Sequence, residues 1–303
     1  MTTTTYRAAV IRNPGGPDAI EIIDVPVVEP GPGQVRVAIA GAAVNPVDLA
    51  TAAGVFHGMG LVHQPDHTGL GWDFAGTVTA AGPGVDVRVG TRVAGLVAGF
   101  DRDFGTYAEQ LVVPAGDTAP VPDSLDLITA ATVPLNGLAA AQMVDLLGDG
   151  DGRNLLVTGA AGAVGGYATR LAQDRGWQVT GLARAEDEAF VRSLGAAFTT
   201  EPTPGWDAVA DAAALQRAAV ALVRDGGSFV GVQPGQAPPE ERGITVRVVV
   251  AVPDGPRLAP LLAATAGGHL PARVHAVVPL DEVASAQRAV AKGGVRGKYV
   301  LEP

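Results

Sequence analysis

Residues 154–166 read NLLVTGAAGAVGG. They are followed directly by a helical stretch, YATRLAQDRG, and then by a second apolar run, WQVTGL. Gly159, Gly162 and Gly165 therefore stand three residues apart between an apolar strand and a helix. In such a turn the first glycine allows a tight bend, the second lets the backbone approach a pyrophosphate, and the third lets helix and strand pack closely. The start of the helix then faces the phosphate charge. The stretch predicts a strand–helix–strand unit that binds a dinucleotide.

The end of the second strand of this unit reads Leu182-Ala183-Arg184. Folds that prefer NAD usually place an acidic residue here, to bind the ribose 2′-hydroxyl. A guanidinium can instead bind a 2′-phosphate through charge-assisted hydrogen bonds. The sequence therefore predicts NADPH as the cofactor. The alternative is an exposed arginine that pairs with one of the acids at 186–188. The cofactor contacts predicted from this unit are Gly159, Ala160, Gly162, Ala163, Val164, Gly165, Ala183 and Arg184.

Around this unit, from about Asp126 onward, alanine-rich helical stretches alternate with short apolar runs. That alternation predicts a parallel sheet covered by helices on both faces. The strands expected in this sheet are 155–158, 179–182, 208–210, 228–232 and 245–250. One more helix is expected after Asp254. It is followed by strands at 274–278 and 298–301, with a helix at 281–293 between them. Because a last strand needs a sheet to bury it, the C-terminal piece is expected to rejoin the first domain.

The first 120 residues contain short β-rich runs separated by Gly and Pro, which predict a curled antiparallel sheet or barrel. One helix is expected near Pro46, where NPVDLATAAG offers a helix start and a terminal glycine. The strands expected here are 6–12, 34–44, 73–81, 92–97 and 107–113.

Composition excludes several function classes. The chain has 31 acidic and 21 basic residues, a net charge of −10, and no run of bases, so nucleic acid and anionic membranes are poor partners. With no cysteine it can form neither a disulfide framework nor a thiolate zinc site. No apolar run is long enough for a transmembrane helix, and the first residues lack the apolar core of a signal peptide. A cytoplasmic protein is therefore expected.

Several ordered motifs resemble those of the medium-chain dehydrogenase/reductase superfamily, and specifically its zinc-free NADPH quinone oxidoreductase (zeta-crystallin-like) branch. The resemblance runs nearly from end to end. It implies an α/β protein with a GroES-like β-rich catalytic domain at 1–122, a Rossmann domain with a doubly wound parallel sheet at 123–262, and a return to the catalytic domain at 263–303. It also implies a homodimer through the edge strand at 245–250. The motifs are AAVNPVDLATAAG, GWDFAGTVTAAGPGVDVRVGTRVAG, GTYAEQLVVP, ATVPLNGLAAAQMV, LVTGAAGAVGGYATRLAQ and VRGKYVL.

The resemblance also indicates which residues occupy the catalytic metal positions of zinc-dependent relatives. They are Asn45, Trp72 and about Leu135, none of which suits a tetrahedral zinc site. His63 and His67 are four apart, but Pro65 between them breaks the helix that a shared metal would need. No metal is therefore expected.

Two residues are the candidates for catalysis. The Asn45 amide can donate a hydrogen bond to a developing oxyanion without titrating, although it could instead cap the helix at Pro46. His57 stands in a segment where relatives often carry tyrosines, and its imidazole suits proton delivery near neutrality; the alternative is a surface loop histidine.

Outside the glycine turn, further cofactor contacts are predicted. Asn136, in VPLNGLAAAQ, resembles a segment that enters the cleft, and a turn residue is the alternative. Gln233, with Pro234 and Gly235, follows the carboxyl end of a strand, where open α/β sheets bind ligands. Arg296 and Lys298 could reach a cofactor phosphate, but we expect them to be solvated residues flanking the last strand.

The sequence favours an NADPH-dependent, metal-independent reductase that transfers a hydride to a quinone or a small conjugated enone. The first alternative is an enoyl reductase acting on an activated thioester or biosynthetic intermediate, which needs a proton at the neighbouring carbon. The second is a catalytically silent NADPH-binding protein. The expected partner is the small electron acceptor.

Overall fold

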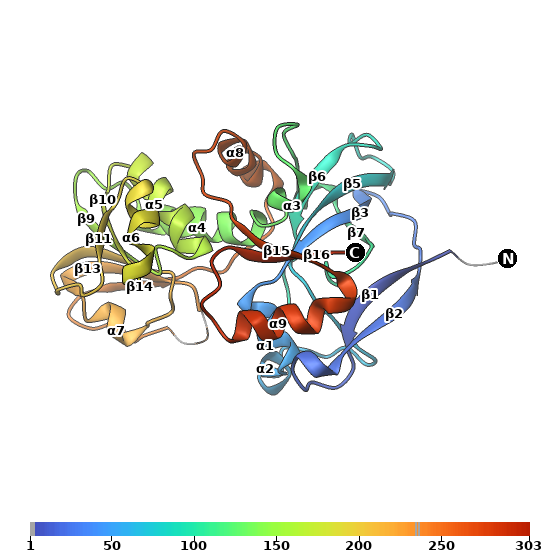
Figure 1. Ribbon diagram of the computed structural model, residues 1–303, viewed down its shortest axis with the longest axis horizontal. Helices are drawn as coiled ribbons and strands as arrows, with labels where there is room; N and C mark the ends of the chain where they lie inside the picture. The colour runs from blue at the N-terminus through green and yellow to red at the C-terminus, as the bar shows by residue number, and fades with distance from the viewer. Residues whose placement is uncertain (1–3, 234, 236) are drawn as a thin grey trace. The chain divides into compact units, whose positions relative to one another are not determined.

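The computed structural model describes residues 4–233, 235 and 237–303. Two compact units divide the chain between them (Figure 1). Unit 1 consists of Met1–Leu135, Val252–Ala266 and Ala272–Pro303, and unit 2 of Asn136–Ala251 and Gly267–Pro271. The stretch 123–135, predicted to open the second domain, lies in unit 1 because its short helix α3 (Leu127–Ala130) packs on strands of that unit.

Unit 1 is built on two sheets. The smaller has the order β2-β1-β4, and the larger has the order β15-β16-β3-β5-β6-β8 with β7 paired to β3. Strand β3, expected at 34–44, has side chains that alternate between partly exposed and buried over most of its length. The smaller sheet comprises β1 (Thr5–Ile11), β2 (Ile20–Pro26) and β4 (Thr68–Gly69). The larger comprises β3 (Gln34–Ala43), β5 (Asp73–Ala81), β6 (Arg92–Leu96), β7 (Gln110–Pro114), β8 (Thr118–Pro120), β15 (Val274–Pro279) and β16 (Lys298–Glu302).

Short helices cover these sheets. The longest, α8, packs against β8, and Gly255 at its start is required because a Cβ there would lie 2.2 Å from the Thr118 carbonyl oxygen. Helix α9 packs on β15 and β16 (Figure 1). The helices of unit 1 are η1 (Pro17–Ala19), α1 (Pro46–Ala52), α2 (Val55–Gly58), η2 (Ala115–Asp117), α3, α8 (Gly255–Ala266), η5 (Leu280–Glu282) and α9 (Val283–Ala291).

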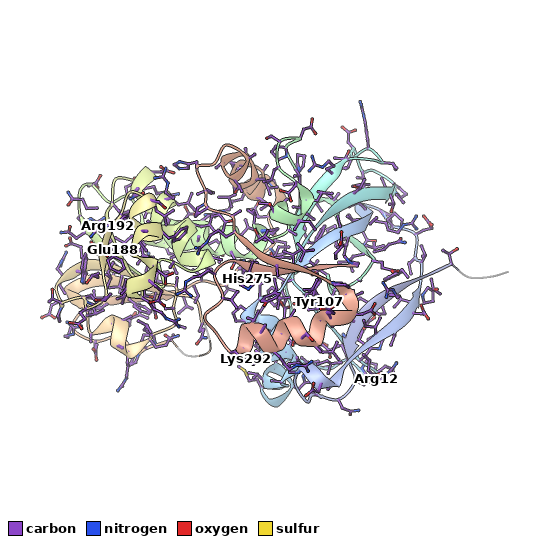
Figure 2. All side chains as sticks on the ribbon, viewed as in Figure 1. Arg12, Tyr107, Glu188, Arg192, His275 and Lys292 are labelled. Atoms are coloured by element: carbon purple, nitrogen blue, oxygen red, sulfur yellow. The ribbon has the colours of Figure 1, made fainter. Side chains whose placement is uncertain are left out.

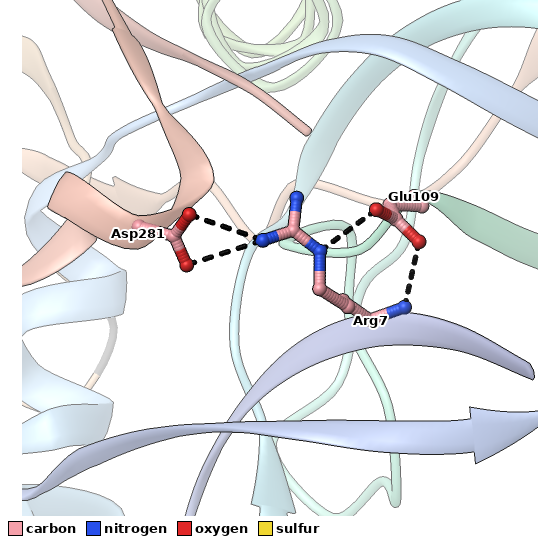
Figure 3. Close-up of polar contacts among 3 residues, drawn as sticks. All are labelled: Arg7, Glu109 and Asp281. Atoms are coloured by element: carbon pink, nitrogen blue, oxygen red, sulfur yellow. Dashed lines mark hydrogen bonds and ion pairs between the residues drawn. The ribbon is translucent and has the colours of Figure 1, made fainter.

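The C-terminal segment closes unit 1. Strand β16 pairs with β3, with Val300 opposite Ala43. Arg7 of β1 adds a second connection, since its guanidinium contacts Glu109 at 2.8 Å and Asp281 of η5 at 3.0 Å (Figure 3). Residues as much as 274 positions apart in the sequence are therefore joined in one unit.

Unit 2 is a six-stranded parallel sheet with the order β11-β10-β9-β12-β13-β14. This is the doubly wound order 3-2-1-4-5-6, which confirms the predicted fold; its switch point lies between β9 and β12. Leu156, Val209 and Phe229 belong to the core of this sheet. The strands are β9 (Asn154–Thr158), β10 (Gln178–Leu182), β11 (Ala197–Thr199), β12 (Trp206–Asp211), β13 (Val223–Gly231) and β14 (Thr245–Val248).

Helices connect these parallel strands. Helix α5 follows β9 and packs on β9, β10 and β12. Helix α6 carries the exposed ion pair Glu188–Arg192 at 2.8 Å (Figure 2). The helices are α4 (Pro134–Leu147), which starts at the end of unit 1, α5 (Ala163–Asp174), η3 (Ala185–Asp187), α6 (Glu188–Ser193) and α7 (Arg217–Val220). Among the described residues no helix combines the length and apolarity needed to cross a bilayer.

Candidate functional site

The turn between β9 and α5 has the geometry of a phosphate cradle. Gly159 has φ of +60°, a conformation that favours glycine. A Cβ on Gly165 would lie 2.2 Å from the Gly159 carbonyl oxygen, so only glycine lets helix and turn approach this closely. Gly162 is the N-cap of the 12-residue helix α5, and Ala163 and Val164 form its first turn. The cradle fits the pyrophosphate of a dinucleotide.

A buried hydrogen-bond network shapes the loop beside this cradle. Thr158, at the end of β9, donates through its hydroxyl to Asp211 at 2.6 Å. Asp211, at the end of β12, also accepts the backbone N–H groups of Leu215 at 3.0 Å and Gln216 at 2.7 Å. These bonds hold a loop in which Ala214 has φ of +55°. The sequence analysis missed Asp211, although an acidic residue ending an apolar strand was a usable signal.

The predicted cofactor-specificity residue is accessible. The side chain of Arg184 is 63% exposed, and its guanidinium lies 3.9 Å from the Glu186 carboxylate. At that separation Glu186 competes only weakly, since exposed ion pairs contribute little. Ala183 is half-buried beside it. Arg184 is therefore mostly exposed to solvent, and its role in binding a 2′-phosphate stays a prediction.

The remaining predicted cofactor residues lie in the glycine turn, in α4 and after β13. Ala160 is buried within the glycine turn. Asn136 is buried in the first turn of α4, so it is not a loop turn residue. Gln233 is exposed after β13. Pro234 lies outside the described residues. The participation of Asn136 and Gln233 in cofactor binding stays a prediction.

In unit 1, Asn45 lies at the centre of a buried polar cluster. It is the N-cap of α1, and its backbone N–H donates to the Asp48 carboxylate at 2.8 Å. Its side-chain amide donates to Asp73 at 2.7 Å and to the Ala43 carbonyl at 3.3 Å. Its side-chain oxygen accepts a hydrogen bond from the Lys298 ammonium at 2.5 Å. Asn45 therefore caps α1, and both hydrogens of its side-chain amide already form hydrogen bonds within the protein.

Two carboxylates anchor this cluster. Asp48 accepts the Tyr107 hydroxyl at 2.9 Å and the Gly71 N–H at 3.2 Å, and burial raises its pKa to about 6. Asp73 accepts the backbone N–H of Leu135 at the start of α4, and burial raises its pKa to about 7. Both carboxylates are fully buried. Tyr107, labelled in Figure 2, lies inside unit 1, and burial raises the pKa of its phenol well above the ordinary value. These carboxylates therefore connect α1, β5 and α4.

Next to the cluster lies a row of aromatic rings. Phe56 of α2 stacks on Phe100 with ring centroids 3.8 Å apart, and Phe100 is tilted against Trp72 at 5.5 Å. The Arg102 guanidinium lies over Trp72 at 5.3 Å, donates to the Val97 and Gly71 carbonyls, and has a pKa that burial lowers to about 10. These contacts hold the loop that follows β6 against Trp72, the residue before Asp73.

His57 is half-buried on α2, with its Nε2 3.3 Å from the Thr68 hydroxyl. Its Nδ1 is buried and has no hydrogen-bond partner among the described residues. The ring is therefore directed toward the body of unit 1 rather than being a fully solvated loop histidine. Its role in proton delivery stays a prediction.

The residues at the metal positions of zinc-dependent relatives do not fit a zinc ion. The amide of Asn45 is saturated with hydrogen bonds, and the indole of Trp72 is packed between Phe100 and Arg102. His63 pairs instead with Asp101 at 3.1 Å. Within the described part of the chain, no group of three or more His, Asp or Glu side chains is arranged to bind a metal.

The sequence interpretation of Lys298 as a solvated residue is wrong. The residue is 8% exposed and points to the same side of β16 as the buried Val300. The pattern of β16 gave no clear signal for this burial, since Glu302, in the same phase as Lys298 and Val300, is exposed. Arg296, by contrast, is half-buried in the loop before the strand.

Comparisons with known proteins agree with this architecture. Residues 31–123 match the family described as the alcohol dehydrogenase GroES-like domain, and residues 187–301 match the zinc-binding dehydrogenase family. The quinone oxidoreductase from Coxiella burnetii superposes with a TM-score of 0.88, covering 99% of this chain and 100% of that one, at 24% identity. At that identity the likeness shows the fold.

Curated relatives match over shorter stretches. The polyketide synthase GfsB of Streptomyces halstedii is 35% identical over 75% of this chain, which is 4% of its own length. The chloroplastic quinone-oxidoreductase homolog of Spinacia oleracea is 31% identical over 60% of this chain and 56% of its length. The trans-enoyl reductase pgmF of Aspergillus terreus is 33% identical over 55% of this chain and 48% of its length. The matches thus span only about half of these last two relatives.

Proposed function

Since this chain belongs to the medium-chain dehydrogenase/reductase superfamily and is similar to its quinone oxidoreductases, we propose that it is an NADPH-dependent, metal-independent reductase of quinones or small conjugated enones. The observation that carries this proposal is the glycine cradle at the start of α5, next to the switch point of the parallel sheet. Such a cradle serves a dinucleotide, and the cofactor supplies a hydride when bound.

The cradle and the end of β10 would hold the cofactor. The backbone of 159–165 would bind the pyrophosphate, with the α5 N-terminus contributing its partial positive charge. Arg184 would bind the 2′-phosphate, and Asn136 and Gln233 would contact the rest of the cofactor. In the overall balance one quinone, one NADPH and one proton give one hydroquinone and one NADP⁺.

For the acceptor we propose a flat conjugated molecule. The partly exposed Phe56–Phe100 stack offers aromatic surface in unit 1, and aromatic rings favour offset or edge contacts with other π systems. Asn45 and His57 remain the polar candidates for oxyanion stabilisation and proton delivery. A quinone can take its proton from water at oxygen, so it makes the smaller demand on these side chains.

A second candidate is an enoyl reductase. The similarity to the trans-enoyl reductase of Aspergillus terreus favours it. That reaction needs a proton at the carbon next to the carbonyl, and the half-buried His57 is the group proposed to deliver it. Dependence of turnover on His57 therefore separates the two candidates.

The test is NADPH oxidation with a panel of quinones, enones and enoyl thioesters, followed by absorbance. We expect turnover with the first two classes. Turnover restricted to enoyl thioesters would support the second candidate. Tight NADPH binding without turnover on any acceptor would overturn both and support a silent binding protein.

A further inference from the structure

Lys298 is a buried ammonium that does not lie in an ion pair. It is 8% exposed, and the one hydrogen bond recorded for its side-chain ammonium, among the described residues, goes to the neutral amide oxygen of Asn45. No carboxylate forms an ion pair with it among the described residues, although Asp73 and Asp48 act on it through space. Buried charges are usually paired directly, because desolvation is costly. The arrangement therefore calls for an explanation.

Lys298 and Asn45 differ in the number of hydrogen-bond donors that they have left for a ligand. An ammonium carries three N–H donors and an amide carries two. Both amide hydrogens of Asn45 already bond to Asp73 and Ala43, so Asn45 must break a bond to serve a ligand. Lys298 uses one donor of three, which leaves two for an incoming acceptor atom. At this cluster Lys298, rather than Asn45, has unused donors.

We propose that Lys298 is a further catalytic residue, whose ammonium donates a hydrogen bond to the oxygen of the electron acceptor that becomes negative during hydride transfer. This inference rests on the proposed function. Asn45 then acts as a positioning residue, since its side-chain oxygen holds the ammonium while Asp73 holds the amide. A fixed cation aimed at developing charge lowers the barrier without reorganisation.

The carboxylates near Lys298 favour the charged form of its side chain. Burial lowers the pKa of its ammonium, while Asp73 and Asp48 oppose that change. Arg102 is the second cation of the cluster, and the Asp48 carboxylate acts on it through space. Two carboxylates and two cations therefore balance without direct neutralisation of Lys298, and its positive charge remains available to an oxygen atom.

The composition of the chain makes a direct test available. Its lysines are Lys292 and Lys298 only, so protein labelled with ¹³C at the lysine Cε gives two side-chain signals. Lys292 is exposed at the end of α9 and serves as the internal control. The probe is 4-nitrophenol, whose phenolate mimics the charged oxygen and absorbs visibly.

In the holoprotein with NADP⁺, we expect 4-nitrophenolate to shift the Lys298 signal and not the Lys292 signal. We also expect the phenolate to bind more tightly than the neutral phenol. Lys298→Met should weaken phenolate binding about tenfold or more, and Lys298→Arg should retain much of it, since loss of one charge-assisted hydrogen bond is that large. Lys292→Met should change nothing.

Activity gives the second readout. With a quinone that the parent reduces, Lys298→Met should lower kcat about 10²-fold, and Lys298→Arg should lose much less, with NADPH affinity unchanged in both. Parent-like phenolate binding and kcat in Lys298→Met would overturn the proposal even if the parent is an active reductase. Phenolate binding at Lys298 without turnover by the parent would instead overturn the proposed function and leave the anion site. If Lys298→Met fails to fold, the Lys298 signal in the parent still decides.

Discussion

Lys298 and Asn45, 253 residues apart in sequence, lie 2.5 Å apart at the ammonium and the amide oxygen. The contact brings the last strand of the chain onto the N-cap of α1, and through Asn45 onto Asp73. Asp73 then accepts the N–H of Leu135 in the first turn of α4, the helix that continues into unit 2. The Asn45 amide and Asp73 therefore connect β16, α1, β5 and α4. We expect the ionisation of the groups around this amide to affect both the stability of the protein and its turnover.

Stability should fall as the pH rises through neutrality. Burial raises the pKa of Asp73 to about 7, above the value of about 3.9 in an unfolded chain. The native state therefore holds this proton more tightly, so the stabilisation is complete below about pH 4 and is lost as the pH rises through about 7. In thermal melts between about pH 5 and pH 8 we expect the Tm to fall by a few degrees, at about 2–4 °C per kcal/mol.

Asp73→Asn removes this titration, so its Tm should depend less on pH than that of the parent. Asp86→Asn, at an exposed loop position, is the matched control and should keep the parent slope. Equal slopes for the parent and Asp73→Asn would show that Asp73 stays ionised throughout this range.

NADPH should bind more tightly than NADH, because the exposed guanidinium of Arg184 can bind the 2′-phosphate. Arg184→Ala should narrow the difference by about 1–3 kcal/mol, the loss of one charge-assisted contact. Titration of both cofactors into both proteins measures this. Arg192→Ala, on α6, is the control and should leave the preference intact. Equal affinities of the parent for the two cofactors would rule out the role of Arg184.

Turnover should survive exhaustive treatment with chelators. The amide of Asn45 and the packed indole of Trp72 do not fit a zinc ion. Elemental analysis should find no stoichiometric zinc in the active protein. Loss of turnover on chelation that added zinc restores would show that the protein uses a zinc ion bound by other residues.

Local pattern and motif order were enough to predict the fold. The glycine turn, the alternation of β3 and the parallel strands of unit 2 all depend on nearby residues, so periodicity and spacing could indicate them. Of the described strands that the sequence pattern did not indicate, three are short, since β4 has two residues and β8 and β11 have three each. The fourth, β2, has seven residues but lacks a regular alternation.

The polar cluster was harder to predict. Asn45 was found through its place before a helix, but Asp73, Tyr107 and Lys298 reach it from three separate strands or loops. No spacing in the sequence indicates that these residues meet. Lysine is also almost never fully buried, so the expectation of a solvated Lys298 followed the general trend and failed at this site.

The last prediction separates Asn45 from His57. Asn45→Ala should lower turnover about 10²-fold or more, with cofactor affinity little changed, because it removes either a preorganised donor or the group that holds Lys298. His57→Ala should then do little. If proton delivery limits the reaction, as an enoyl substrate requires, His57→Ala should instead lower turnover about 10²–10⁴-fold.

A double-mutant cycle resolves the first case. If Asn45 acts only through the ammonium, Asn45→Ala combined with Lys298→Met should be no slower than Lys298→Met alone, since residues acting as one unit are not additive. Independent donors would give losses that multiply. Near-parental turnover in Asn45→Ala, His57→Ala and Lys298→Met, measured on one panel of acceptors, would leave backbone donors and cofactor positioning as the source of the rate.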